Sequence, residues 1–274
     1  MTAPDASPAS RSRAPRPVCL ITGASSGIGA DLAHCAAADG FDLVLVARRI
    51  TALADVARVC EKKHDVKVTI IQSDLADPTA CRVLAAELRA RQLPVHTLIN
   101  NAGFGASGSI ASIAVETQLN MIQVNITALT ELTRRLLPGM LERGSGAVMN
   151  VASTAAFLPG PGMAVYYASK AYVLSFTEAL AEELRGTGIG VTALCPGPTA
   201  TEFGAVAGMS ESKLFKQRGI QLTSAEVARA GWDALLAGER IVIPGFANKV
   251  LIQSLRTAPR MIVARISALL NASS

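Results

Sequence analysis

One tyrosine and one lysine are spaced so that they could transfer protons together. Tyr166 and Lys170 lie four positions apart in a stretch with helical character, so their side chains project from the same face. A tyrosine hydroxyl has an ordinary pKa of about 10 and needs a nearby cation to exchange protons near neutral pH. Lys170 could supply that cation, which predicts that Tyr166 is a general acid or base. A chance pair at helical spacing is the alternative.

Further polar side chains are expected near this pair, at the carboxyl edge of a predicted sheet. Ser153 directly follows the apolar run 146–152, and its hydroxyl could hydrogen-bond a substrate carbonyl. Asn125 lies among apolar residues of a predicted helix, where an amide is an odd choice for packing alone. The sequence Asn-Asn-Ala-Gly at 100–103 ends another predicted strand at the same edge. These placements predict one polar site at the strand ends.

A glycine-rich turn after the first predicted strand is suited to holding a dinucleotide. The segment 22–29 reads Thr-Gly-Ala-Ser-Ser-Gly-Ile-Gly, and its glycines permit a tight turn and close approach to a pyrophosphate. The helix that follows begins there, where free N–H groups and the helix dipole favour an anion. A turn of small residues that merely packs a helix on a strand is the alternative. The predicted cofactor contacts of this turn are Gly23, Ser25, Ser26, Gly27, Ile28 and Gly29.

Two arginines at the end of the second predicted strand indicate which dinucleotide is bound. In sites that prefer NAD, an acidic side chain near this strand end binds the ribose 2′-hydroxyl, whereas arginine accommodates a 2′-phosphate. Arg48 and Arg49 occupy this place, and a planar guanidinium suits phosphate. They predict NADP(H) as the cofactor, with solvated strand-capping arginines as the alternative. Asp74 and Leu75 follow the third predicted strand, where the adenine would pass, although Asp74 fits a turn-capping role nearly as well.

Composition argues against several other kinds of chemistry. The five cysteines lack CxxC spacing and the three histidines do not cluster, so neither a disulfide framework nor a metal site is expected. No apolar run approaches the roughly 18 to 20 residues that span a bilayer, and the first segment lacks the apolar region of a secretory signal. The net charge of +5 is concentrated at the two ends of the chain, which is a poor footprint for nucleic acid. We therefore expect a cytoplasmic protein without a nucleic-acid partner.

The elements that must position these residues form an alternating pattern. Short runs rich in Val, Ile and Leu alternate with helical stretches, and strands this continuous are buried on both faces of a parallel sheet. Alternating βαβ units predict a single Rossmann-like, doubly wound α/β domain over 17–245, with helices on both faces. Strands are expected at 17–23, 41–47, 67–72, 96–100, 146–152, 188–195 and 240–244. Helices are expected at 27–40, 51–63, 78–91, 115–137, 165–185 and 224–237.

The two ends of the chain are expected to lie outside this domain. Residues 1–16 are rich in Pro, Ser, Ala and Arg, which is typical of a disordered tail. Residues 246–274 are expected to form a basic amphipathic helical extension. Such a helix could make peripheral contact with an anionic membrane, but packing on the body or on a second subunit is the simpler interpretation. The residues on its predicted apolar face are Ile262, Ile266, Leu269 and Leu270.

In the order and spacing of these motifs, the chain resembles the short-chain dehydrogenase/reductase superfamily, in its single-domain branch. The resemblance covers roughly residues 17–245. Tyr167 is a neighbouring candidate for the catalytic tyrosine, but Tyr166 matches the family's spacing to the serine and the lysine. The matching motifs are TGxxxGxG at 22–29, NNAG at 100–103, Asn125, Ser153, Tyr166-x-x-x-Lys170 and Pro196-Gly197.

The resemblance implies a division of labour among four catalytic residues. Tyr166 would exchange a proton with the substrate oxygen, while Lys170 would lower the pKa of that tyrosine and bind the nicotinamide ribose. Ser153 would orient the substrate and stabilise charge on its oxygen, and Asn125 would hold a water that links the lysine to solvent. The resemblance also implies a homodimer or homotetramer. The further cofactor contacts that it implies are Asn101, Ala102, Gly103, Pro196, Gly197 and Thr199.

The sequence indicates the substrate less clearly than it indicates the cofactor. The segment 203–222 is expected to form a mobile lid, and its apolar residues favour a hydrophobic ketone, aldehyde or acyl compound, or the matching alcohol. A non-catalytic NADP(H)-binding regulatory protein on the same fold is the alternative, against which the complete set of four catalytic residues argues. A sugar-nucleotide epimerase of the same superfamily would need a larger C-terminal lobe than the chain provides after Ile243.

Overall fold

A seven-stranded parallel sheet forms the centre of the protein. The computed structural model describes residues 16–209, 221–256 and 259–271. Within them the strands follow the order β3-β2-β1-β4-β5-β6-β9, and every neighbouring pair is parallel. This order confirms the doubly wound α/β fold predicted from the sequence. The strands are β1 (Val18–Thr22), β2 (Asp42–Ala47), β3 (Val68–Gln72), β4 (Val95–Asn100), β5 (Gly146–Val151), β6 (Ile189–Leu194) and β9 (Ile241–Val242).

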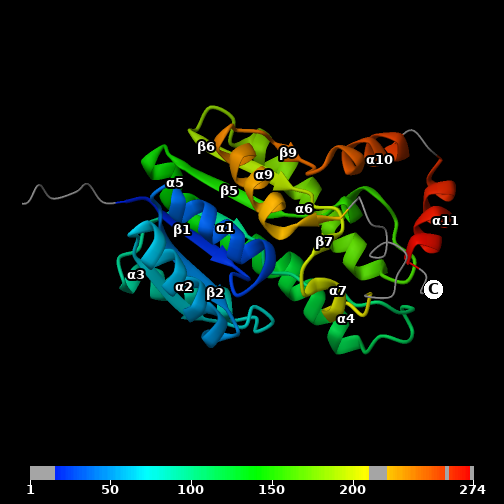
Figure 1. Cartoon of the computed structure of the whole chain (residues 1–274), viewed down its shortest axis with the longest axis horizontal. Helices are drawn as coiled ribbons and strands as arrows, with labels where there is room; N and C mark the ends of the chain where they lie inside the picture. The colour runs from blue at the N-terminus through cyan, green and yellow to red at the C-terminus, as the bar shows by residue number, and fades with distance from the viewer. Residues whose placement is uncertain (1–15, 210–220, 257–258, 272–274) are drawn as a thin grey trace, which may run out of the picture.

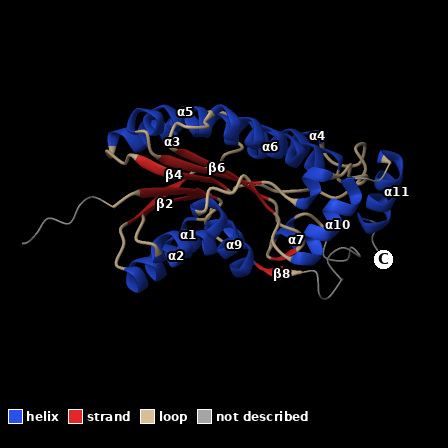
Figure 2. Ribbon diagram, turned by 90° about the horizontal axis from the view of Figure 1, so that it is seen from above, coloured by secondary structure: helices blue, strands red, loops and turns tan. Residues whose placement is uncertain are grey.

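Helices cover both faces of this sheet, as Figure 2 shows. They connect successive parallel strands, because a parallel pair needs a crossover that packs back onto the sheet. On one face lie α1 (Gly27–Ala38), α2 (Ile50–His64) and α9 (Ser224–Leu236). On the other face lie α3 (Ala80–Ala90), α5 (Leu129–Arg143) and α6 (Ala164–Glu183).

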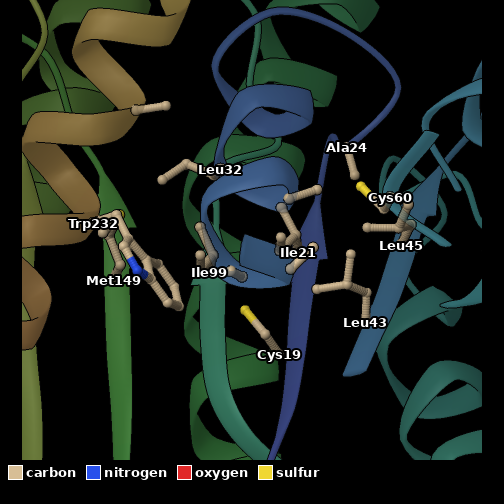
Figure 3. Packing of buried hydrophobic residues seen from close by; sticks show 14 of the residues in the cluster. Cys19, Ile21, Ala24, Leu32, Leu43, Leu45, Cys60, Ile99, Met149 and Trp232 are labelled. Atoms are coloured by element: carbon tan, nitrogen blue, oxygen red, sulfur yellow. The ribbon is translucent and has the colours of Figure 1, made fainter. Parts of the chain in front are cut away.

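The apolar strand residues divide between two cores, one on each face of the sheet. Ile21 and Leu45 belong to the core under α1, where they pack with Trp232 of α9 (Figure 3). Their strand neighbours Leu20 and Val44 belong to the core on the opposite face. Successive strand residues point to opposite faces, so both faces are filled only if nearly every position is apolar. This explains the continuous apolar runs from which the strands were predicted.

One long helical stretch contains an irregularity that the sequence did not predict. The helix expected at 115–137 consists of α4 (Val115–Ile122), a π-helical segment η1 (Gln123–Ala128) and then α5. The predicted end at 137 is too early, because α5 continues through Pro138 to Arg143. A π-helical turn often marks a functional site, and Asn125 lies within this one.

The chain beyond β6 forms short elements and a two-helix extension. β7 (Thr199–Ala200) pairs with β8 (Leu222–Thr223), and α7 (Phe203–Val206) lies between them in sequence. The extension consists of α10 (Phe246–Arg256) and α11 (Arg260–Asn271), which lie beyond the carboxyl ends of the strands (Figure 1). Among the described residues, no helix is long and apolar enough to cross a bilayer.

Some predictions concern residues that the structure does not describe. The proposed disordered tail falls almost wholly in residues 1–15, and much of the expected lid falls in 210–220; both ranges lie outside the described residues. The side chain of Leu270, assigned to the apolar face of the extension, is also outside them.

Candidate active site

Three of the predicted catalytic side chains meet at the carboxyl end of β5. Ser153 follows this strand and caps the short 3₁₀ helix η2 (Thr154–Phe157), where its Oγ accepts a 3.1 Å hydrogen bond from Ala155 N. Tyr166 and Lys170 lie one turn apart in α6, and both are buried. The Ser153 hydroxyl donates a 3.4 Å hydrogen bond to Pro196 O, and it lies close enough to the Tyr166 phenol to lower the pKa of that group. The lysine Nζ lies 5.8 Å from the centre of the tyrosine ring.

Burial dominates the protonation of this group. It raises the pKa of the Tyr166 phenol above its usual range, and the nearby Ser153 hydroxyl offsets part of this effect. Burial lowers the pKa of Lys170 to about 8, and the lysine Nζ donates a 2.8 Å hydrogen bond to Val151 O. The expected lowering of the tyrosine pKa by the lysine is therefore not the dominant effect in the protein alone. The phenol is protonated at neutral pH and is ready to donate.

Asn125 contacts this group from the π-helical segment. Its Oδ1 accepts from Phe104 N at 3.1 Å, and its Nδ2 donates to Phe104 O and Ser169 Oγ, each at 3.0 Å. A Cβ added at Gly103 would lie 3.1 Å from Asn125 Oδ1 and 3.3 Å from Lys170 Nζ. The asparagine therefore fixes the loop after β4 against α6, immediately behind the lysine. Its expected role in holding a water stays a prediction.

The glycine-rich turn packs closely against the same loop. Asn101 Nδ2 donates to Thr22 O at 2.9 Å and to Gly23 O at 3.1 Å. A Cβ added at Gly29 would lie 2.4 Å from Gly23 O and 2.4 Å from Asn101 Nδ2. Gly23 and Gly27 have φ angles of 65° and 54°, which residues other than glycine rarely adopt. The turn therefore requires glycine and leaves bare backbone facing the adjoining space.

The start of α1 has the properties of an anion site. Its N-cap residue, Ser26, makes no side-chain capping hydrogen bond, so the N–H groups of the first turn stay available. Arg49 lies beside it, with its Nη2 2.8 Å from Ser26 Oγ and 2.8 Å from Glu202 Oε2. Asp74 Oδ1 accepts from Ala76 N at 3.0 Å, so it does cap a turn, which was the alternative that the sequence left open.

One cavity of about 810 Å³ connects all these groups. Three of the four predicted catalytic residues line it, whereas Asn125 lies behind Gly103. Every cofactor contact predicted from the sequence also lines it: Gly23, Ser25, Ser26, Gly27, Ile28, Gly29, Arg48, Arg49, Asp74, Leu75, Asn101, Ala102, Gly103, Tyr166, Lys170, Pro196, Gly197 and Thr199.

The far end of this cavity is formed by residues that sequence reasoning missed. Ile252 of α10, which is 1% exposed, lines it together with Leu251 and Leu255. Asn271 of α11 fixes this extension to the catalytic helix: its Oδ1 accepts from Tyr167 OH at 2.9 Å, and its Nδ2 donates to a backbone carbonyl at 3.1 Å. An asparagine close to the apolar residues at the end of an amphipathic helix was the available signal for this contact.

Comparisons with known proteins agree with this geometry. The short chain dehydrogenase family matches residues 17–211 of the chain. Sulfoacetaldehyde reductase from Chromohalobacter salexigens is 40% identical over 186 residues, which cover 67% of this chain and 73% of that protein. Ketoacyl reductase HetN from Nostoc sp. is 35% identical over 178 residues, which cover 65% of this chain but only 62% of that relative.

Two solved structures illustrate the range of cofactors among similar proteins. A short-chain dehydrogenase from Sphingobium yanoikuyae in complex with NADPH has a TM-score of 0.78 and 34% identity, covering 89% of this chain and 96% of that one. A short-chain dehydrogenase/reductase from Burkholderia phymatum in complex with NAD has a TM-score of 0.76 and 27% identity, covering 87% and 92%. Similar structures therefore hold both dinucleotides.

Proposed function

Because the chain belongs to the short-chain dehydrogenase family, we propose that it is an NADP(H)-dependent oxidoreductase that interconverts a carbonyl and an alcohol. Its favoured reaction is the reduction of a hydrophobic ketone, aldehyde or acyl compound. The observation that carries this proposal is the cavity in which Tyr166, Ser153 and Lys170 lie between the glycine-rich turn and an apolar end. A purely regulatory protein would not need these three side chains in one cavity.

The phosphate-facing end of the cavity supports NADP(H). The bare turn at Gly23 and Gly29 has no room for a Cβ, and Ser26 leaves the first turn of α1 uncapped. The uncapped helix start suits a pyrophosphate, and the backbone of the turn lines the cavity where one would lie. Arg48 and Arg49, which line the same end, support a 2′-phosphate in preference to a bare ribose. When bound, the cofactor supplies the hydride.

The chain's own residues move and hold the proton. Burial keeps Tyr166 protonated, so its hydroxyl donates a proton to the substrate oxygen. Ser153 lies beside this tyrosine and lines the same cavity, so its hydroxyl can turn from Pro196 O to the substrate oxygen, which then accepts from both hydroxyls and is stabilised as charge develops. The Lys170 ammonium balances the phenolate that remains and holds the nicotinamide ribose. Asn125 keeps the loop and the lysine in place and holds the water that connects the lysine to solvent.

The other end of the cavity supports an apolar substrate. The ring of Phe203 lies 5.2 Å from that of the catalytic tyrosine, and Met163 together with Leu251, Ile252 and Leu255 of α10 also lines the cavity. A pocket lined in this way favours a hydrophobic group attached to the reacting carbon, since polar groups buried there would lack partners.

The proposal extends to partners and location. Members of the family are typically oligomers, and we propose a homodimer or homotetramer. Met261, Ile262 and Leu269 of α11 are exposed, and the basic residue Arg265 lies on the same helix. These residues supply the surface for a second subunit or for peripheral contact with an anionic membrane. The five free cysteines support a reducing, cytoplasmic location.

Two neighbouring tyrosines give a matched test of the proposed catalysis. Tyr166→Phe removes the proton donor, and we expect turnover to fall by roughly 10² to 10⁴ while NADPH binding persists. Tyr167→Phe removes only the hydroxyl that binds Asn271; it should retain kcat, whereas KM for an apolar substrate rises because that contact supports the apolar end of the cavity. Purified variants are compared by NADPH oxidation with a panel of apolar ketones and aldehydes, and by fluorescence titration of NADPH. Native turnover by Tyr166→Phe would overturn the mechanism, and NADPH binding without turnover of any panel member would favour the regulatory alternative.

A further inference from the structure

The carboxylate of Glu202 forms an ion pair with Arg49, the arginine expected to bind a 2′-phosphate. Glu202 Oε2 lies 2.8 Å from Arg49 Nη2, and its Oε1 lies 3.3 Å from Arg49 Nη1. The guanidinium therefore binds this carboxylate through two nitrogens, which is also how it would hold a phosphate. Ser26 Oγ donates to Glu202 Oε2 at 2.9 Å and accepts from Arg49 Nη2 at 2.8 Å, while Ser25 Oγ accepts from the same nitrogen at 3.4 Å. One acidic side chain thus occupies two of the groups expected to bind the cofactor, Arg49 and Ser26.

The neighbours of Glu202 hold this carboxylate in position. The Cγ2 of Thr201 would lie 3.0 Å from a Cβ added at Gly27, so the threonine packs over the glycine-rich turn. On the other side, the ring of Phe203 lies 5.2 Å, centre to centre, from the ring of Tyr166. An exposed ion pair usually contributes little because both side chains lose conformational freedom. Here the backbone is anchored on both sides, so less freedom remains to be lost.

The charges of this pair reinforce one another. The hydrogen bonds from Arg49 and Ser26 lower the pKa of Glu202, and the hydrogen bond to Glu202 raises the pKa of Arg49. The carboxylate therefore stays ionised across the neutral range and competes as an anion. A phosphate carries more charge than a carboxylate and has more acceptor oxygens, so it can displace the carboxylate. A ribose 2′-hydroxyl carries no charge and cannot.

We propose that Glu202 is a determinant of cofactor selectivity that competes with the 2′-phosphate of NADP(H) for Arg49 and Ser26. Before the cofactor binds, the carboxylate takes the place of the phosphate; the phosphate must displace it, so Glu202 weakens the binding of NADP(H) and leaves that of NAD(H) almost unchanged. This inference rests on the proposed function, because it assumes that a dinucleotide binds with its 2′-position at Arg49.

Two nucleotides that differ only in the 2′-phosphate isolate this competition. Adenosine 2′,5′-bisphosphate and AMP are titrated calorimetrically into the full chain, its Glu202→Gln and Arg49→Ala variants, and the double variant. We expect Glu202→Gln to tighten the bisphosphate roughly three- to tenfold and to change AMP binding less than twofold. In the Arg49→Ala background the same substitution should have almost no effect. Glu239→Gln is the matched control, since this glutamate is exposed, precedes the edge strand β9 and does not line the cavity.

The outcomes separate this inference from the proposed function. If Glu202→Gln binds the bisphosphate no more tightly than the native chain does, the proposed competition is wrong. Weaker binding would mean that the carboxylate contacts the bound cofactor and stabilises it. An equal gain for AMP would also overturn the competition, because the effect would then be one of overall charge. If the native chain binds neither nucleotide nor NADPH, the proposed cofactor fails and the inference fails with it. Native binding that Glu202→Gln leaves unchanged would refute the inference alone.

Discussion

The protonation states of Tyr166 and Lys170 favour reduction over oxidation in the free protein. A phenol that burial keeps protonated can give a proton to a carbonyl oxygen, whereas oxidation would first require its phenolate. The lysine is the group whose state changes near physiological pH, because burial has lowered its pKa to about 8. The pH dependence of the reaction should therefore follow the lysine more closely than the tyrosine.

This assignment predicts a loss of activity on the alkaline side. The value of kcat/KM for NADPH, which reports ionisations of the free enzyme, should fall as pH rises through about 8. Above that pH, Lys170 loses the proton with which, in the proposed mechanism, it would hold the ribose and balance the phenolate. Initial rates between pH 6.5 and 9.5 check this prediction. Lys170→Met should be much slower and show no inflection near pH 8; an inflection that persists in this variant would assign it to another group.

Residue types and spacing were sufficient to find most of the candidate site, because parallel strands bring their carboxyl ends to one edge. Ser153 was placed at the site because it directly follows a predicted strand. Tyr166 and Lys170 were placed there because they lie near the start of a predicted helix. Glu202 was not foreseen as a partner of Arg49. The two residues are 153 positions apart, and no local pattern specifies which loop returns across the glycine-rich turn. Only the packing of residues 201–203 brings them together.

At the scale of elements, helical glycines differ sharply in what surrounds them. A Cβ at Gly29, in the first turn of α1, would lie 2.4 Å from backbone oxygen. A Cβ at Gly139, within α5, would meet nothing nearer than the guanidinium of Arg143 at 3.4 Å. The first position has no room for a side chain, whereas the second has room.

The two glycines predict opposite results for the same substitution. Gly29→Ala should push the turn away from the loop after β4 and weaken NADPH binding at least roughly tenfold, since even small displacements at a binding site are costly. Gly139→Ala should leave binding unchanged and raise the free energy of unfolding by up to about 1 kcal/mol, the usual helical preference for alanine. Fluorescence titration and urea unfolding measure the two effects. Native NADPH affinity in Gly29→Ala would remove the close approach at this turn from the binding mechanism.

The strands and main helices could be predicted because each fills a core on a definite face. Continuous apolar runs require burial on both sides, and the structure places Leu20 and Ile21 in opposite cores. The π-helical segment η1 could not be predicted in this way. Its cause is tertiary, since Asn125 bonds to both the N–H and the C=O of Phe104 in another loop. Short pairings such as β7 with β8 likewise depend on contacts that no local periodicity encodes.

At the scale of the whole molecule, one cavity joins the two ends of the chain. The turn between β1 and α1 lines part of it, and the C-terminal helices α10 and α11 line another part. The α1 turn and Arg49 form the phosphate-facing end of the cavity, whereas α10 and α11 form its apolar end. The buried face of α11 carries Val263, Ser267 and Asn271, while much of its predicted apolar face is exposed. The extension therefore packs on the body through this buried face, which includes the hydrogen bond between Asn271 and Tyr167.

This arrangement predicts that Asn271→Ala affects the substrate but not the cofactor. The substitution removes the hydrogen bond from Tyr167 and loosens the wall of the apolar end. Loss of about 1 kcal/mol should raise KM for an apolar ketone roughly fivefold, while the Kd for NADPH stays within twofold. Gln253→Ala, at an exposed position of α10, should change neither. A raised Kd for NADPH with an unchanged KM would mean that Asn271 acts through the catalytic helix and not through the substrate wall.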